Sequence, residues 1–74
     1  MSESGRDFDG RKLEQARKAK GLTRRQLASL TGIGERRLFD YVTGRKKPTL
    51  AVVVRLADAL ELKVDDLIGE VDAA

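Results

Sequence analysis

The chain has 74 residues and contains neither cysteine nor histidine, which excludes a disulfide framework, a thiolate metal site and the commonest general base. A chain of this length forms at most one domain, and it buries only about 60 % of its unfolded surface, so we expect a thin core. Residues 1–47 carry 13 Lys and Arg against 6 Asp and Glu, whereas residues 48–74 carry 2 against 6. The basic excess of the first part predicts a polyanionic partner for one face.

Residues 1–7 are polar and predict a flexible segment, with Phe8 as the first anchor of the fold. Asp9 can accept hydrogen bonds from the free amides that begin a helix, which predicts a first helix at about 10–20. Gly21 ends this helix, because glycine accepts the left-handed geometry of a helix exit. No apolar run is long enough for a signal peptide or a membrane span, so a cytoplasmic or nucleoid location is expected.

A capping box predicts the second helix. Thr23 and Gln26 have the spacing at which the threonine hydroxyl accepts from the third amide of the helix while the glutamine reaches back. Gly32 ends this helix after roughly two turns, and so short a helix requires packing to hold it. A third helix is expected to begin near Gly34 and to end at residues 43–44.

The last part of the chain predicts a longer apolar helix and a short final one. Thr49 caps a helix at about 50–60, whose apolar residues cover so much of its circumference that it is central or shared with another chain. Three successive valines would also suit a strand, but the helical periodicity continues to Leu60 and there is no other strand signal. A fifth helix is expected at about 64–68, and residues 70–74 are expected to form a tail.

The third predicted helix has a polar outer ridge. At about 100° per residue, its apolar residues Leu38, Tyr41 and Val42 cluster toward the core. Three residues point the opposite way and define the ridge: Arg36, Asp40 and Thr43. An arginine there can bind O6 and N7 of guanine, and an aspartate can accept from the N4 amine of cytosine. The alternative is that Arg36 and Asp40 only pair with each other, which is worth about 0.2–0.5 kcal/mol.

The residues beside this ridge leave alternatives open. Arg37 lies off its centre and is expected to reach a phosphate rather than a base. Glu35 either complements the positive end of the helix dipole or contacts a base. Phe39 either touches a thymine methyl group or packs beneath the end of the second helix.

Two basic clusters bracket the third helix. Thr23 and Arg24 stand at the start of the second helix, where free amides bind a phosphate readily. Arg45, Lys46 and Lys47 follow the third helix, and together the two clusters can clamp phosphates on either side of one groove; the alternative is a solvated loop. No enzyme is indicated, because the serines have no histidine to activate them, and we expect no cofactor or metal.

These motifs resemble the lambda-repressor-like, Cro-type or XRE-type helix-turn-helix domains, over roughly residues 8–68. The matching positions run through most of the chain: Arg17, Gly21-Leu22-Thr23, Leu27-Ala28, Gly32, Gly44, Pro48, Leu56-Ala57 and Leu60. The resemblance implies an all-α, five-helix domain at 8–69 that binds double-stranded DNA as a two-fold homodimer. The protein is expected to be of bacterial or phage origin and to act in the cytoplasm, associated with the nucleoid. The resemblance implies base contacts from Gly34, Glu35, Arg36 and Asp40. It also implies phosphate contacts from Thr23, Arg24, Thr43 and the loop of residues 45–47.

One departure from the family pattern concerns Arg17. The family often ends the third helix with Glu-Asn-Gly, and that glutamate usually pairs with the arginine of the first helix. This chain has Val42-Thr43-Gly44 instead. Arg17 is therefore expected to turn toward Asp40, a carbonyl group or solvent, and the posture of the third helix is expected to differ.

We therefore predict a sequence-specific transcriptional regulator that docks residues 34–43 into the major groove, as a homodimer. Apolar residues of the last two helices are the predicted dimer surface: Val52, Leu56, Leu62, Val64 and Ile68. The alternative is a protein-interaction module of the same fold, such as an antitoxin or adapter that binds a partner protein. The broad apolar surface of the fourth helix and the acidic last part of the chain favour that alternative.

Overall fold

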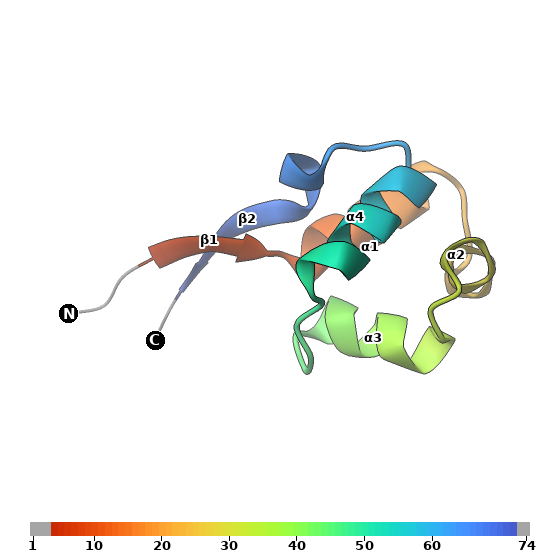
Figure 1. Ribbon diagram of the computed structural model, residues 1–74, viewed down its shortest axis with the longest axis horizontal. Coiled ribbons are helices and arrows are strands. Elements are labelled where there is room, and N and C mark those ends of the chain that lie inside the picture. The colour runs from red at the N-terminus through yellow and green to blue at the C-terminus, as the bar shows by residue number, and fades with distance from the viewer. Residues whose placement is uncertain (1–3, 73–74) are drawn as a thin grey trace.

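The computed structural model describes residues 4–72, which form four α-helices, one 3₁₀ turn and a two-stranded antiparallel ribbon (Figure 1). The elements follow one another as β1 Ser4–Phe8, α1 Gly10–Ala19, α2 Arg24–Thr31, α3 Glu35–Thr43, α4 Leu50–Ala59, η1 Val64–Leu67 and β2 Ile68–Asp72. The helices pack into one body, and the ribbon projects from one side of it (Figure 1). This projection makes the molecule elongated, with extents of 41 × 22 × 21 Å.

The predicted helix caps are confirmed. The Asp9 carboxylate accepts from the N–H of Arg11 at 2.9 Å, and α1 begins there. Thr23 and Gln26 form both hydrogen bonds of the capping box that opens α2. The Thr49 hydroxyl caps α4 by accepting from the N–H of Val52. These caps are local, which is why the sequence alone locates the four helices closely.

A small leucine-rich core holds the helices together. Six leucines are at most 1 % exposed and come from all four helices, the residue that ends α4, and η1: Leu13, Leu27, Leu38, Leu56, Leu60 and Leu67. Ile33, in the turn between α2 and α3, and Tyr41, in α3, complete the side of the core beneath α3. The third helix is therefore fixed to the body along its inner face, as its apolar periodicity predicts.

The expected fifth α-helix is wrong, because residues 64–67 form a single 3₁₀ turn. The Asp66 carboxylate accepts from the N–H of Lys63 at 2.9 Å, which closes the turn upon itself. Ile68 then has extended backbone angles and begins β2. Pairing with β1 takes the chain out of the helical conformation before a second turn can form.

The described ends of the chain are paired, which differs from the expected flexible segment and tail. Strand β1 pairs with β2 in the register Ser4↔Asp72 to Phe8↔Ile68, so the all-α expectation holds only for the helical body. The expected segments 1–7 and 70–74 also include residues 1–3 and 73–74, which lie outside the described residues. Strands that pair across most of the chain leave no local signal, and this ribbon is anchored by the edge-to-face contact of Phe8 with Tyr41, with ring centroids 6.4 Å apart.

Gly10 brings the start of α1 against the end of α3. A Cβ atom at this position would lie 2.4 Å from the carbonyl oxygens of both Tyr41 and Val42. Only glycine permits this approach of two backbones, and it fixes the C-terminal end of α3 to the body. This contact ties α1 to α3 without the glutamate–arginine pair that the family pattern would supply.

Candidate nucleic-acid interface

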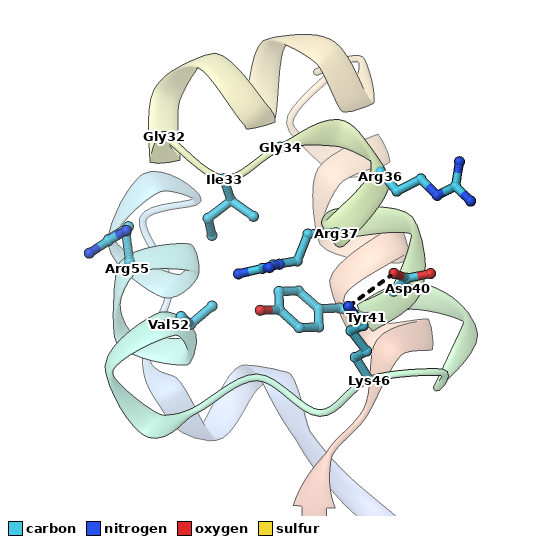
Figure 2. Close-up of a pocket in the computed structure, with 10 residues that line it drawn as sticks. All are labelled: Gly32, Ile33, Gly34, Arg36, Arg37, Asp40, Tyr41, Lys46, Val52 and Arg55. Carbon is cyan, nitrogen blue, oxygen red and sulfur yellow. Dashed lines mark ion pairs between the residues drawn. The ribbon is translucent and has the colours of Figure 1, made fainter.

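The third helix presents a polar outer surface, as its sequence predicts. Gly34 caps it with extended backbone angles, and the first turn exposes Glu35, Arg36 and Arg37. Arg36 points away from α4, whereas Arg37 leans across the space between α3 and α4 (Figure 2). Arg37 therefore lies on the α4 side of the helix, whereas the Arg36 side chain extends outward from it.

A depression of about 410 Å³ lies between α3 and α4 on the flank of Arg37 (Figure 2). Lys46 and Arg55 line it together with Arg37, and the ring of Tyr41 lies at its centre. Sequence reasoning missed Arg55, because nothing in the pattern of its helix sets this residue apart. Its place beside Arg37 depends on how the helices are arranged in the folded chain, which no local pattern reports.

A second depression, of about 560 Å³, lies on the other flank of α3. Its charged residues come from α2, α3 and the following loop: Arg24, Glu35, Arg36, Asp40 and Arg45. Phe39 also lines it and is 45 % exposed. The third helix thus runs between two concave and mainly cationic surfaces, the arrangement that clamping both edges of a groove requires.

Asp40 is not exposed as the outer ridge predicts, because its side chain is only 11 % accessible. The loop after α3 folds back over it: the N–H of Lys46 donates to the carbonyl of Asp40 at 3.2 Å, and Lys46 Nζ lies 4.0 Å from its carboxylate (Figure 2). Within residues 4–72 Arg36 forms no ion pair with Asp40, so the alternative of a simple i,i+4 pair is wrong as well. A helical wheel gives direction around the axis but does not account for covering loops.

The predicted phosphate-binding residues at the start of α2 and in α3 differ in whether their donor groups remain available for a phosphate. The Thr23 hydroxyl accepts from Gln26 and keeps its own proton for a ligand. Arg24 is turned inward: its guanidinium lies 3.6 Å from Glu14 and 5.2 Å from the centre of the Phe39 ring. The Thr43 hydroxyl donates to the carbonyl of Phe39 at 2.9 Å, so in this rotamer it has no proton for a phosphate.

The loop after α3 is tethered to the ribbon. Arg45, Lys46 and Lys47 are all exposed, and Lys47 Nζ lies 2.6 Å from the carboxylate of Asp7 in β1. The hydrogen bond from Lys47, joined by one from the N–H of Phe8, lowers the pKa of Asp7 below its ordinary value. Sequence reasoning missed this contact because it assigned Asp7 to a flexible segment.

Arg17, expected to lack its usual partner, is held by one residue of α1 and by the segment that follows this helix. Its guanidinium donates to Glu14 at 3.0 Å and to the carbonyl of Leu22 at 2.6 Å, so the carbonyl alternative is confirmed and the Asp40 alternative is wrong. Glu14 lies between Arg17 and Arg24 and joins α1 to the start of α2. The hydrogen bond from Arg17 lowers the pKa of Glu14 and outweighs the opposite effect of its partial burial.

A Glu14→Gln variant tests the link between α1 and α2 through the pH dependence of thermal stability. Because the folded-state pKa of Glu14 is lowered, its contribution to stability is present above the unfolded value of about 4.3 and is lost as pH falls through the folded value. We therefore expect the melting temperature of the wild type to exceed that of Glu14→Gln at pH 7, and the gap to narrow below about pH 4.3. Thermal melts between pH 3 and pH 7 measure the gap, and a gap that does not change with pH would contradict the assignment.

The predicted dimer surface needs one correction. Leu56 has no exposed surface, because it lies in the core of the monomer, so it cannot meet a second chain. Val52, Leu62 and Val64 are half-buried against that core, and Ile68 is half-buried in β2. The exposed apolar residues of α4 are instead Leu50, at 72 %, and Val54, at 40 %.

Among residues 4–72, no group of three or more acidic, histidine or cysteine side chains is arranged to hold a metal ion. No helix of the same residues has both the length and the apolar character needed to cross a membrane.

Comparison with known proteins gives a sequence match and a structural match. The sequence model of a protein family described as "Helix-turn-helix" matches residues 13–67. The cryptic phage CTXphi transcriptional repressor RstR of Vibrio cholerae is 38 % identical over 58 residues, which are 78 % of this chain and 52 % of the repressor. The chain thus spans about half the length of this curated relative.

Solved structures with this arrangement of helices include two bacterial proteins. The restriction-modification controller protein C.AhdI from Aeromonas hydrophila is 31 % identical, with a TM-score of 0.76 over 78 % of this chain and 88 % of the controller. The clp gene regulator ClgR from C. glutamicum is 29 % identical, with a TM-score of 0.74 over 78 % of this chain and 75 % of the regulator.

Proposed function

The chain belongs to the XRE-type helix-turn-helix family, and from this premise we propose that it is a transcriptional regulator that binds double-stranded DNA sequence-specifically. In this proposal α3 lies in the major groove with its N-terminal turn against the base edges. The similar proteins are a repressor, a controller protein and a gene regulator, which favours this function over that of an antitoxin or adapter.

The observation that carries the proposal is the exposed first turn of α3 between two cationic depressions. Arg36 points away from the body and presents its guanidinium fork as a guanine reader. Gly34 and Glu35 lie beside it and are assigned to the same base edges. Asp40, with its carboxylate mostly covered, is assigned to hold Lys46 rather than to read a base as its main task.

The two depressions supply the contacts to the phosphates. Thr23 and Arg45 are assigned to phosphates on the side of α3 where Arg36 lies. Arg37 and Arg55 are assigned to phosphates on the side that faces α4. Lys46 and Lys47 extend the surface of Arg37 and Arg55 along the loop after α3. Arg24 is turned inward and the Thr43 hydroxyl donates within its helix, so these two are minor contributors. Such contacts position the helix without reading the sequence.

We further assign a two-fold homodimer, since one helix of this length reads only a few base pairs and two half-sites multiply the specificity. The candidate contacts between the two chains are Leu50, Val52, Val54, Leu62, Val64 and Ile68. Leu56 is no longer among them, because it is buried in the monomer. The exposed leucine and valine add apolar side chains to this surface, and apolar side chains form the core of subunit interfaces.

Selection of duplexes from a random pool, followed by two variants, tests this function. We expect a selected site with two related half-sites, and we expect Arg36→Ala to weaken binding to it by about 5- to 150-fold while relaxing preference at one base pair. Lys47→Ala should weaken selected and scrambled duplexes by similar factors and make the dependence on salt less steep by about one unit of slope per monomer.

Lys18→Ala is the matched control, because it removes the same charge from an exposed position of α1 that lines neither depression. It should leave both affinities nearly unchanged. Equal weakening of both duplexes by Arg36→Ala would overturn the assigned role of Arg36, and failure to retain any duplex at low salt would overturn DNA binding itself.

A further inference from the structure

An aromatic ring lies exposed in the middle of a charged surface. Phe39 is 45 % exposed, and the other residues around the depression are all charged: Arg24, Glu35, Arg36, Asp40 and Arg45. A large apolar group in this place loses contact with water only when a ligand covers it. The ring belongs to the same outer surface of α3 as the proposed base-reading residues.

The ring is held in one posture by a chain of contacts that begins in α1. The carbonyl of Leu22 accepts from Arg17 at 2.6 Å, Arg17 donates to Glu14 at 3.0 Å, and Glu14 lies 3.6 Å from Arg24. The guanidinium of Arg24 then lies over the Phe39 ring at 5.2 Å from its centre, within the range of a cation–π contact. A ring supported in this way meets a ligand with little loss of conformational freedom.

We propose that Phe39 is a specificity-determining residue that contacts the C5-methyl group of a thymine, one in each half-site. The inference rests on the proposed DNA-binding function and deepens it. The thymine methyl is the apolar group that base pairs display in the major groove, so it is the natural partner for an apolar ring on a helix that enters that groove.

The surroundings of the ring favour a small apolar partner over a second protein. Charged side chains border Phe39 on every element that lines the depression, and three of the five are arginines. An apolar docking surface for a protein would need neighbouring apolar residues, whereas Leu30, the exposed leucine of α2, does not line this depression. Arginines on both sides of the ring instead suit the phosphates and bases that flank a thymine.

The sequence left two alternatives for Phe39, a thymine contact and packing beneath α2. The structure places one side of the ring against Arg24 of α2 and leaves nearly half of its surface free. Packing on α2 therefore orients the ring, and the free surface remains for the base. The two alternatives describe two sides of one ring.

Deoxyuridine, which lacks only the C5-methyl of thymine, tests the contact in the selected duplex. Each thymine is replaced in turn, and the affinity of the full chain is measured for the wild type and for Phe39→Ala. At one position per half-site we expect the replacement to weaken wild-type binding about fourfold, the worth of one buried methyl group. The same replacement should leave Phe39→Ala binding unchanged.

Two variants keep the test specific. Phe39→Leu retains an apolar side chain and should keep part of the fourfold penalty, and Leu30→Ala removes an exposed leucine elsewhere and should keep all of it. A selected duplex at which no replacement weakens the wild type, or at which Phe39→Ala shows the same penalty, would overturn the inference while leaving DNA binding intact. Failure to select any duplex would overturn the proposed function and the inference together.

Discussion

A Gly10→Ala variant is expected to lose about 3 kcal/mol of its free energy of unfolding, which corresponds to a fall in melting temperature of roughly 10–20 °C. The added Cβ would lie 2.4 Å from two carbonyl oxygens of α3, and backbone atoms cannot move aside as a side chain does. Alanine is otherwise the better helix former, so helix propensity alone predicts the opposite sign. Thermal and urea unfolding followed by circular dichroism measure the loss.

Gly5→Ala is the control for this substitution, because a Cβ there would meet no atom within 4 Å. It should melt within a few degrees of the wild type. A Gly10→Ala protein that melts with the Gly5→Ala control would contradict the close approach of α1 to α3.

A Leu56→Ala variant should lose about 2–5 kcal/mol of unfolding free energy, because the leucine is completely buried and its removal leaves a cavity. A small domain of this size has only about 5–10 kcal/mol of stability, so the variant would be partly unfolded near body temperature. Leu50→Ala removes the same atoms from a side chain that is 72 % exposed and should change monomer stability little.

The same two variants distinguish core from interface. Sedimentation should show that Leu50→Ala weakens self-association of a folded chain, whereas Leu56→Ala acts through folding. A stable Leu56→Ala monomer that no longer associates would restore Leu56 to the interface and contradict its place in the core.

Local signals predicted the helical part of the fold. Asp9, Thr23 and Thr49 each carry the cap that they indicate, because a cap involves residues at most three apart. The apolar residues of α4 were less informative, since they cover most of its circumference and only packing decides that Leu56 is buried while Leu50 is exposed. The fifth helix failed for a similar reason, because the pairing of β2 with β1 competes with it.

The residues of the candidate site also divide into those that local patterns predict and those that only packing brings together. Arg36 and the basic loop were visible from charge and helical direction alone. Arg55 beside Arg37, Asp7 on Lys47 and Arg24 over Phe39 each join residues from different elements, so only the packed chain reveals them. Asp40 shows the limit of the helical wheel, since a loop that the wheel does not include covers its carboxylate.

The ribbon has a consequence for the order in which the molecule assembles. Its five residue pairs join residues 4–8 to residues 68–72, and all four helices lie in the chain between them. Closing so long a loop costs more conformational entropy than forming contacts within a helix or between neighbouring helices. Residues 4–8 are synthesised before residues 68–72, so β1 has no strand to pair with until the whole helical part has been made. The helices α1 to α4 can pack before that point. We therefore expect the ribbon to be the last element to form during folding and the first to open during thermal fluctuations, with the helical body folding before its two ends meet.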